Sequence, residues 1–283
     1  MMKKHILIIA DGRSAITTRW IELLRSLDYR VSLVSSYPLS NKPNVDNLFI
    51  LPVAFSAAGE VKQSSDHNNV NSKQTIHWKR QIIQYARPLA MKLRYWLGPY
   101  TLPNYQNQLL SIISTLKPDL VHALRIPYEG MLACITPQNI PLLVSVWGND
   151  FTLHANANQK MKELTRSILN RTNGLIADVH RDINLSFQLG FSCEKPSLVV
   201  PGGGGIHLSE ILTTANVKNL RFSVPENTPL IVNPRGIRAY AQTDVFFQSI
   251  PIILQELSNA IFLCPAMEGK PEANHWVENL KIQ

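Results

Sequence analysis

Two short apolar runs, Leu120–Ala123 and Leu142–Val146, are each followed by polar residues that can take part in chemistry. Apolar runs of this length, bounded by turn residues, are typical of strands that are buried on both faces of a parallel sheet. Ligands of such sheets bind outside the carboxyl ends of the strands. The polar side chains expected to line one crevice there are His122, Arg125, Glu129, Asn149 and Asp150.

Each of these side chains also has a purely structural interpretation. His122 can be a hydrogen-bonded histidine of the core, and Asp150 can cap the helix that follows it. Glu129 can begin a helix after Pro127, where an acidic residue suits the helix dipole. Trp147 suits the core as well as a platform for a sugar ring. The residue types alone leave these alternatives open.

The chain begins with a β-α-β pattern, which predicts a parallel sheet with a right-handed crossover. Strands are predicted at His5–Ala10 and Arg30–Ser35, and an amphipathic helix at Ile16–Leu27. The turn after the first strand lacks the G-x-G-x-x-G fingerprint, so NAD and FAD are disfavoured. Gly12, with the helix N-terminus after it, can instead receive an anion or a sugar hydroxyl.

Alternating elements continue the α/β pattern over a first domain, residues 1–205. Further strands are predicted at Asn47–Val53, Gly174–Val179 and Ser197–Val200, and helices at 104–116, 158–170 and 180–189. The four glycines at 202–205 are not followed by the Lys-Ser/Thr of a P-loop, and we interpret them as a flexible exit from this domain.

A second, incomplete domain is predicted at 229–283, after an irregular linker at 206–228. Its elements are a strand from Leu230, a helix at 243–256, a strand at Ala260–Cys264 and a helix at 272–280. A β-α-β-α fragment of this size is small for an independent core.

The net charge of +8 is concentrated in one part of the first domain. No acidic residue occurs between Asp66 and Asp119, whereas basic and aromatic residues alternate over residues 73–96. This pattern can lie at the surface of an anionic membrane. The alternative is a solvated helix that packs on the sheet. No nucleic-acid-binding motif accompanies the charge, so nucleic acid is not expected as a partner.

The composition, with 45% hydrophobic and 17% charged residues, is that of a soluble globular protein. No apolar run approaches the roughly 18–20 residues that span a bilayer. The apolar start is short, and Asp11 closes it without a cleavage site for a signal peptase. The three cysteines lie far apart, which argues against a zinc site or a disulfide framework. A cytoplasmic location is expected, with peripheral attachment to the inner face of the membrane as a further expectation.

Several motifs, in this order, resemble glycosyltransferase family 4. They are Arg13-Ser-x-x-Thr-x-x-Trp20, Pro118–His122, Gly148–Asp150 and Val232–Gly236. The likeness extends over residues 1–270. It implies the GT-B fold, in which a first Rossmann-like domain holds the acceptor and a second holds a nucleotide-sugar. It also implies retaining transfer to a glycan or lipid-linked acceptor, as in polysaccharide biosynthesis, without a metal or other cofactor.

The resemblance assigns roles to particular residues. His122 and Asp150 match residues near the reacting sugar and are the catalytic candidates. Arg235 matches an arginine that meets the donor diphosphate, where bidentate donation stabilises charge on the leaving phosphate. Arg238 is the nearest substitute for a lysine that the family places where this chain has Tyr240.

The remaining candidates come from the turns that face the expected crevice. Gly12 is assigned to the donor side. The residues assigned to acceptor binding are Arg13, Arg125, Glu129 and Asn149.

Two departures from the family pattern bear on activity. Leu124 stands where the family often has a second histidine, and leucine cannot hydrogen-bond through its side chain. The family's Glu-x7-Glu motif, which holds the donor, would lie beyond the last residue given. These departures predict weak or absent catalysis by this chain alone. They also keep open a non-catalytic module that binds an acceptor or a membrane surface.

Other enzyme classes fit less well. A serine hydrolase is disfavoured because the G-x-S-x-G motif is missing. A pair of carboxylates for glycoside hydrolysis is not obvious, because acidic residues are sparse.

Overall fold

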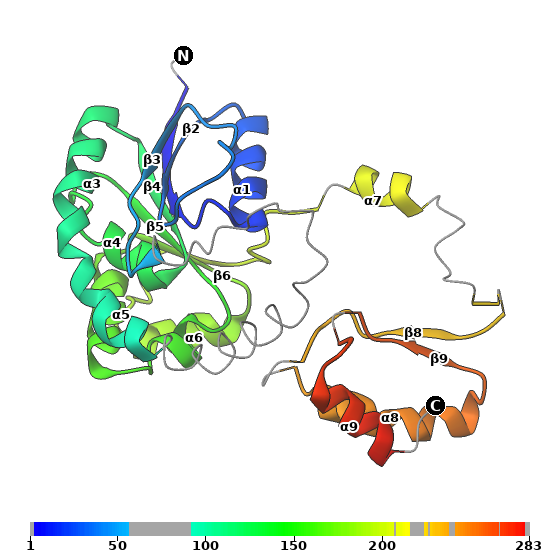
Figure 1. The fold of residues 1–283 in the computed structure, drawn as a ribbon. Coiled ribbons are helices and arrows are strands. Elements are labelled where there is room, and N and C mark those ends of the chain that lie inside the picture. Colours follow the sequence, from blue (N-terminus) through cyan, green and yellow to red (C-terminus); the bar gives the residue numbers. More distant parts are fainter. Residues whose placement is uncertain are drawn as a thin grey trace, which may run out of the picture. The chain divides into compact units, whose positions relative to one another are not determined.

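The computed structural model describes residues 3–56, 92–206, 208–215, 224–225, 227–237, 241–265 and 267–280. Most of the basic segment at 73–96, and Arg238, lie outside these residues. The chain divides into two compact units, Met1–Ile206 and His207–Gln283 (Figure 1).

A seven-stranded parallel sheet forms the centre of the first unit, with strand order β3-β2-β1-β4-β5-β6-β7. The strands are β1 (His5–Ala10), β2 (Arg30–Ser35), β3 (Asn47–Ile50), β4 (Leu120–Leu124), β5 (Leu142–Val146), β6 (Gly174–Ala177) and β7 (Ser197–Val199). The chain builds outward from β1 to β3 and then returns to the other side of β1 with β4. The switch point between β1 and β4 is where open α/β sheets bind ligands.

The helices of the first unit, in chain order, are α1 (Ala15–Ser26), α3 (Pro103–Leu116), α4 (Met131–Ala133), α5 (Gln159–Arg171) and α6 (His180–Gln188). Residues 92–97 are also helical. Tighter or wider helical turns occur at η2 (Gly98–Thr101), which is a 3₁₀ turn, and at the π turns η3 (Ile126–Gly130) and η4 (Asp150–His154). The two π turns follow β4 and β5 directly.

Alternate residues of the central strands serve two cores, one on each face of the sheet. Leu7 and Ile9 of β1 pack in the larger core with residues of α3 and α5. Ile6 and Ile8 pack in the smaller core with Ile21 and other residues of α1. In Figure 1, α1 lies on one side of the sheet and α3 on the other.

Helix α1 begins at Ser14, whose side chain accepts a hydrogen bond from the Ile16 backbone N–H at 3.3 Å. The buried face of the helix is formed by Thr17, Ile21 and Leu24. The predicted helix, Ile16–Leu27, lies one residue later in the sequence than the observed one, and Leu27 is exposed. Thr17 is buried, and its hydroxyl donates to the Asp11 carbonyl at 2.8 Å.

The glycine-rich segment is held against the first unit at its start. The Gly202 N–H donates to Asp178 at 2.7 Å, and the Gly202 carbonyl accepts from the Trp20 indole N–H at 2.9 Å. Our interpretation of this segment as a flexible exit was therefore wrong for Gly202. The expected irregular linker also contains a helix, α7 (Leu208–Ala215). Leu208, Ile211 and Leu212 follow a helical spacing that the sequence analysis did not use.

The second unit contains two parallel strands and two further helices. These are β8 (Leu230–Val232), β9 (Ile261–Leu263), α8 (Thr243–Glu256) and α9 (Pro271–Asn279). The predicted bounds of the helix at 243–256 are confirmed. A small core forms around Phe247, Ile250, Met267 and Ala273.

Candidate functional site

A cavity of about 280 Å³ opens at the carboxyl ends of β1 and β4, at the switch point of the sheet. Its walls come from the turn after β1, the end of β2, the helix at 92–97 and the two π turns. The lining residues are Asp11, Ser14, Tyr37, Arg94, Tyr95, Leu124, Arg125, Pro127, Tyr128, Glu129, Trp147 and His154.

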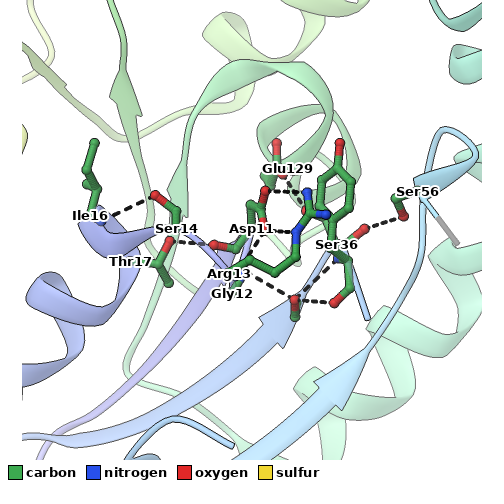
Figure 2. A network of polar contacts seen from close by, with 11 residues as sticks. Asp11, Gly12, Arg13, Ser14, Ile16, Thr17, Ser36, Ser56 and Glu129 are labelled. Atoms are coloured by element: carbon green, nitrogen blue, oxygen red, sulfur yellow. Dashed lines mark hydrogen bonds and ion pairs between the residues drawn. The ribbon is translucent and has the colours of Figure 1, made fainter. Parts of the chain in front are cut away.

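Asp11 lines one side of the cavity and forms an ion pair with Arg13, which lies outside the cavity wall (Figure 2). The Arg13 guanidinium donates from Nε and Nη2 to the two Asp11 carboxylate oxygens, both at 3.0 Å. The Arg13 backbone N–H also donates to Asp11, at 3.0 Å. The guanidinium carbon lies 3.6 Å from the centre of the Tyr37 ring. The hydrogen bonds that Arg13 donates to Asp11 raise the pKa of Arg13.

Arg125 directly follows β4 and has a backbone conformation that residues other than glycine rarely adopt, with φ 106° and ψ 150°. This region is populated almost only by glycine and costs about 1–3 kcal/mol elsewhere. Three hydrogen bonds hold this conformation, each 3.0 Å long. The Arg125 N–H donates to the Ser145 carbonyl, and the Gly130 N–H donates to the Arg125 carbonyl. The Ile126 N–H donates to the Asp150 side chain. The conformation turns the chain from β4 into η3, which carries Glu129.

Asp150 is the buried anchor behind this turn. One carboxylate oxygen accepts from Arg125 Nε at 3.1 Å. The other accepts from the backbone N–H groups of Ile126 and Trp147, at 3.0 and 3.2 Å. Burial raises the pKa of Asp150, while the Arg125 charge and the two N–H groups oppose this effect. All its partners are donors, which suits the ionised carboxylate.

His154 extends the same network to the cavity wall. Arg125 Nη2 lies within hydrogen-bonding distance of His154 Nε2, and Tyr95 Oη lies 2.7 Å from Nδ1. Because a guanidinium can only donate, Nε2 must accept, and Nδ1–H donates to Tyr95. Burial, followed by the charges of Arg125 and Arg94, lowers the pKa of His154 to about 4. The imidazole is therefore neutral at pH 7.

Glu129 is 4% exposed and lies in the cavity wall. Its Oε1 accepts a short hydrogen bond from the Ser36 hydroxyl (Figure 2), while no described residue pairs with Oε2. Burial raises the pKa of Glu129 to about 7, although Ser36 and Arg125 favour the charged form. A carboxyl group that titrates near neutral pH in a cavity can exchange hydrogen bonds or protons with a ligand.

Two more buried polar atoms of the cavity wall have no partner among the described residues. They are Arg94 Nε and Trp147 Nε1. The Arg94 guanidinium lies over the rings of Tyr37 and Tyr128, 5.5 and 5.1 Å from their centres. Arg125 lies 5.6 Å from the centre of the Trp147 ring. Trp147 thus borders the cavity, in addition to packing against the smaller core.

The structure brings Arg125 and Glu129 together in the cavity wall, as the sequence analysis expected. His122 does not line it. The His122 ring is 2% exposed, lies 2.9 Å from the Ser145 hydroxyl, and packs edge-on against Trp20 with ring centres 5.2 Å apart. Burial lowers its pKa to about 3. These contacts favour the structural interpretation of His122, which is covered by Trp20 two residues before the end of β4.

Four other predicted residues of the first unit also lie outside the cavity wall: Arg13, Asp150, Asn149 and Gly12. Arg13 pairs with Asp11, Asp150 lies behind Arg125, and Asn149 is exposed. The Gly12 N–H donates to the Ser35 hydroxyl at 3.1 Å, and a side chain at Gly12 would meet Leu39 and Ser35 at 2.9 Å. Gly12 therefore permits close packing on β2 and Leu39.

Arg235 is exposed in the second unit, just after β8. Its backbone N–H donates to the Asn233 side chain at 3.1 Å. Arg235 is therefore not one of the residues that line the cavity of the first unit.

Sequence reasoning missed several residues of the cavity wall. These are Asp11, Ser14, Tyr37, Arg94, Tyr95, Tyr128 and His154. Asp11 had a usable signal, because it directly follows a buried strand. His154 had a weaker one, four residues after Asp150. Nothing in the sequence predicted that Arg94 and Tyr95 line this cavity, because their helix is far from β4 and β5 along the chain.

Within the described ranges, no three histidine, cysteine or acidic residues gather in a way that could hold a metal ion. None of the described helices is long and apolar enough to cross a membrane.

Residues 80–179 match a protein family described as "Glycosyl transferase 4-like". This segment supplies all the cavity-lining residues except Asp11, Ser14 and Tyr37. No curated protein matches the chain.

Solved structures show the same overall fold at low sequence identity. UDP-GlcNAc 2-epimerase from Neisseria meningitidis, bound to UDP-GlcNAc, matches with a TM-score of 0.53 and 13% identity, over 98% of this chain and 69% of that one. UGT89C1 from Arabidopsis thaliana, complexed with UDP-L-rhamnose, matches with a TM-score of 0.50 and 13% identity, over 96% and 67%. The predicted GT-B fold is thereby confirmed.

The chain spans only part of several matched proteins. It covers 65% of UDP-N-acetylglucosamine 2-epimerase from Rickettsia bellii, with a TM-score of 0.43 and 12% identity over 98% of this chain.

Proposed function

We propose that this glycosyltransferase 4-like chain of GT-B fold transfers a sugar from a nucleotide-sugar to a glycan or lipid-linked acceptor. The observation that carries the proposal is the cavity at the β1–β4 switch point, whose walls come mainly from the family-matching segment. In this proposal the predicted first domain, residues 1–205, binds the acceptor. The predicted second domain, residues 229–283, contributes residues that bind the donor, and residues 206–228 link the two.

Arg235 is the donor-side residue of the proposal, with Arg238 as a second cation. The Asn233 side chain holds the Arg235 backbone by its hydrogen bond at 3.1 Å, while the guanidinium is exposed. A guanidinium can donate two parallel hydrogen bonds to a diphosphate and stabilise the charge that grows as the sugar leaves. The leaving phosphate then serves as the base, and no metal is required.

A non-catalytic, acceptor-binding module is the second candidate. One observation favours it: the Leu124 side chain lies in the cavity wall, where it can neither donate nor accept a hydrogen bond. A module of this kind would bind an acceptor and transfer nothing. The two candidates differ in whether radiolabelled sugar appears on the acceptor.

A membrane surface is the proposed location of the acceptor. The described end of the basic segment exposes Leu93, Trp96 and Tyr100 at 55%, 70% and 65%. Lys92 is exposed on the same stretch. Aromatic and aliphatic side chains next to lysine suit the interface of an anionic bilayer.

Substitution of Arg235 tests the donor side. Arg235→Ala should weaken binding of a UDP-, GDP- or ADP-sugar by about 10- to 100-fold, because hydrogen bonds to a charged group contribute about 1.5–3 kcal/mol. Isothermal titration calorimetry measures the change. Arg30→Ala is the matched control, because it removes an exposed arginine at the amino end of β2. Equal affinity of the Arg235→Ala variant and the unchanged protein would remove Arg235 from the donor site.

A further inference from the structure

We propose that the cavity binds the sugar ring of a neutral acceptor, and that Glu129, Arg94 and Trp147 hydrogen-bond its hydroxyl groups. This inference deepens the proposed function, because it names the chemical class of the acceptor. Binding of the sugar can nevertheless be measured without a donor.

Two charged groups of the cavity wall are paired with charges outside it. Asp11 is paired with Arg13, and Arg125 with Asp150. The other two charged groups of the wall, Arg94 and Glu129, form no ion pair with any described residue. Their charges have opposite sign, so the cavity as a whole offers little net attraction to an anion.

Three buried atoms of the wall lack partners within the described part of the chain: Glu129 Oε2, Arg94 Nε and Trp147 Nε1. A buried polar group without a partner costs about 1–3 kcal/mol, which a ligand that supplies the partner recovers. The arginine and tryptophan atoms donate, and the ionised carboxylate accepts. A hydroxyl group can both donate and accept, so a polyhydroxylated ring can satisfy all three atoms.

The size and the walls of the cavity also suit a single ring. At about 280 Å³ it lies just below the range of ligand sites, roughly 300–1,000 Å³. The rings of Tyr37, Tyr95 and Tyr128 supply apolar faces. Aromatic rings beside a few polar groups allow the apolar face of a sugar to pack while its hydroxyls find partners.

A phosphate would be disfavoured in the same place. It would lie near the Glu129 carboxyl and the Asp11 carboxylate, which already raises the pKa of Glu129 by repulsion. Only Arg94 would offer it an uncommitted positive charge. The chemistry of the wall therefore favours a neutral ligand over a phosphorylated one.

Glu129 also gives the binding a characteristic pH dependence. Burial and Asp11 raise its pKa to about 7, while Ser36 and Arg125 oppose the rise. The other titratable or charged groups that share its cavity are Arg94, Tyr37, Tyr95, Tyr128 and His154. A hydrogen bond from a hydroxyl to a carboxylate is about twice as strong as a neutral one. Sugar binding should therefore strengthen as the pH rises through 7.

Saturation-transfer-difference NMR on the full chain tests the inference. The probes are the methyl glycosides of glucose, galactose, mannose, rhamnose and N-acetylglucosamine, with inorganic pyrophosphate as the anionic probe. We expect at least one glycoside to bind, and to bind more tightly at pH 8 than at pH 6. Glu129→Gln should weaken this binding at pH 8 by roughly tenfold, the scale of one hydrogen bond, and abolish its pH dependence.

Trp147→Phe provides a second variant, because it removes the indole N–H and keeps an aromatic ring. It should also weaken glycoside binding. Glu194→Gln is the matched control for charge, because Glu194 is exposed on the loop after α6. Thermal unfolding of each variant shows that the fold is kept.

Three outcomes would overturn the inference. They are the absence of binding by every glycoside, unchanged binding in both the Glu129→Gln and Trp147→Phe variants, and displacement of a bound glycoside by pyrophosphate at equal concentration. Titration of the same samples with nucleotide-sugars tests the donor side separately. Glycoside binding without nucleotide-sugar binding would contradict the proposed transfer and support the sugar site.

Discussion

At the scale of single residues, Glu129 links the cavity to the stability of the first unit. Its pKa is about 7 in the folded protein against an ordinary value of 4.5, so the folded state holds the proton more tightly. Stability from this group is present below pH 4.5 and is lost as the pH rises through 7. The full change corresponds to about 3 kcal/mol, from 1.36 kcal/mol per pKa unit.

Glu129→Gln should therefore remove most of this pH dependence. Urea unfolding at pH 5 and pH 8 should show that the unchanged protein loses about 2–3 kcal/mol more than the variant over this interval, since part of the full change falls below pH 5. At pH 8 the variant should be the more stable protein. The exposed Glu194→Gln variant should behave like the unchanged protein. Parallel pH profiles for the Glu129→Gln variant and the unchanged protein would show that Glu129 is not buried with a raised pKa.

His122 and Arg125 show what residue type alone could indicate. Both were predicted to line a crevice, and only Arg125 does. His122 points to the face of the sheet that α1 covers, where Trp20 and Ser145 contact it. A histidine at the end of an apolar strand fits either role in sequence, because its neighbours come from other elements.

At the scale of elements, the turns after β4 and β5 form one structure. Asp150 accepts hydrogen bonds from Ile126 of η3 and from Trp147, and pairs with Arg125. These contacts hold Arg125 in its strained backbone conformation. The geometry of the cavity wall therefore depends on one buried carboxylate.

Asp150→Asn should reduce the free energy of unfolding by about 3–5 kcal/mol, the usual cost of breaking a buried ion pair. The asparagine keeps one acceptor oxygen and places an NH₂ group against donors. Urea denaturation measures the loss. Asp46→Asn is the control, since Asp46 also accepts from a backbone N–H and pairs with an arginine, but is one third exposed. Equal losses in both variants would mean that Asp150 is not the anchor of this turn.

The elements themselves were largely predictable from local patterns. The strands β1, β2 and β5 and the helix α8 have the expected bounds. The two π turns were not predicted, because their hydrogen bonds depend on how β4 and β5 lie next to each other. Helix α7 was missed because residues 206–228 were interpreted as an irregular linker.

At the scale of the whole molecule, the exposed apolar stretch at Leu93–Tyr100 bears on where the protein acts. The protein should sediment with vesicles that contain phosphatidylserine and less with phosphatidylcholine alone. Binding should fall with added salt, because the Debye length shortens to about 3 Å at 1 M. Trp96→Ser combined with Tyr100→Ser should weaken binding, since both side chains are exposed.

Tyr29→Ser is the control for this prediction, because Tyr29 is an exposed aromatic residue just before β2. If the double variant and the unchanged protein sediment equally, Trp96 and Tyr100 do not contribute to membrane binding. Equal binding to both kinds of vesicle would remove the electrostatic part of the proposal.

The sequence by itself determined the parallel α/β sheet and the location of a site at the carboxyl ends of its strands. The spacing of apolar residues, the turn residues and the order of strands along the chain can be read locally. The resemblance to family 4 also rests on short motifs. Only the tertiary structure decided which side chains enter the cavity. Tyr37, Arg94 and His154 come from three distant segments, and Glu129 acquires its raised pKa from burial beside Asp11. Burial and charge depend on neighbours that the chain brings together only when it folds.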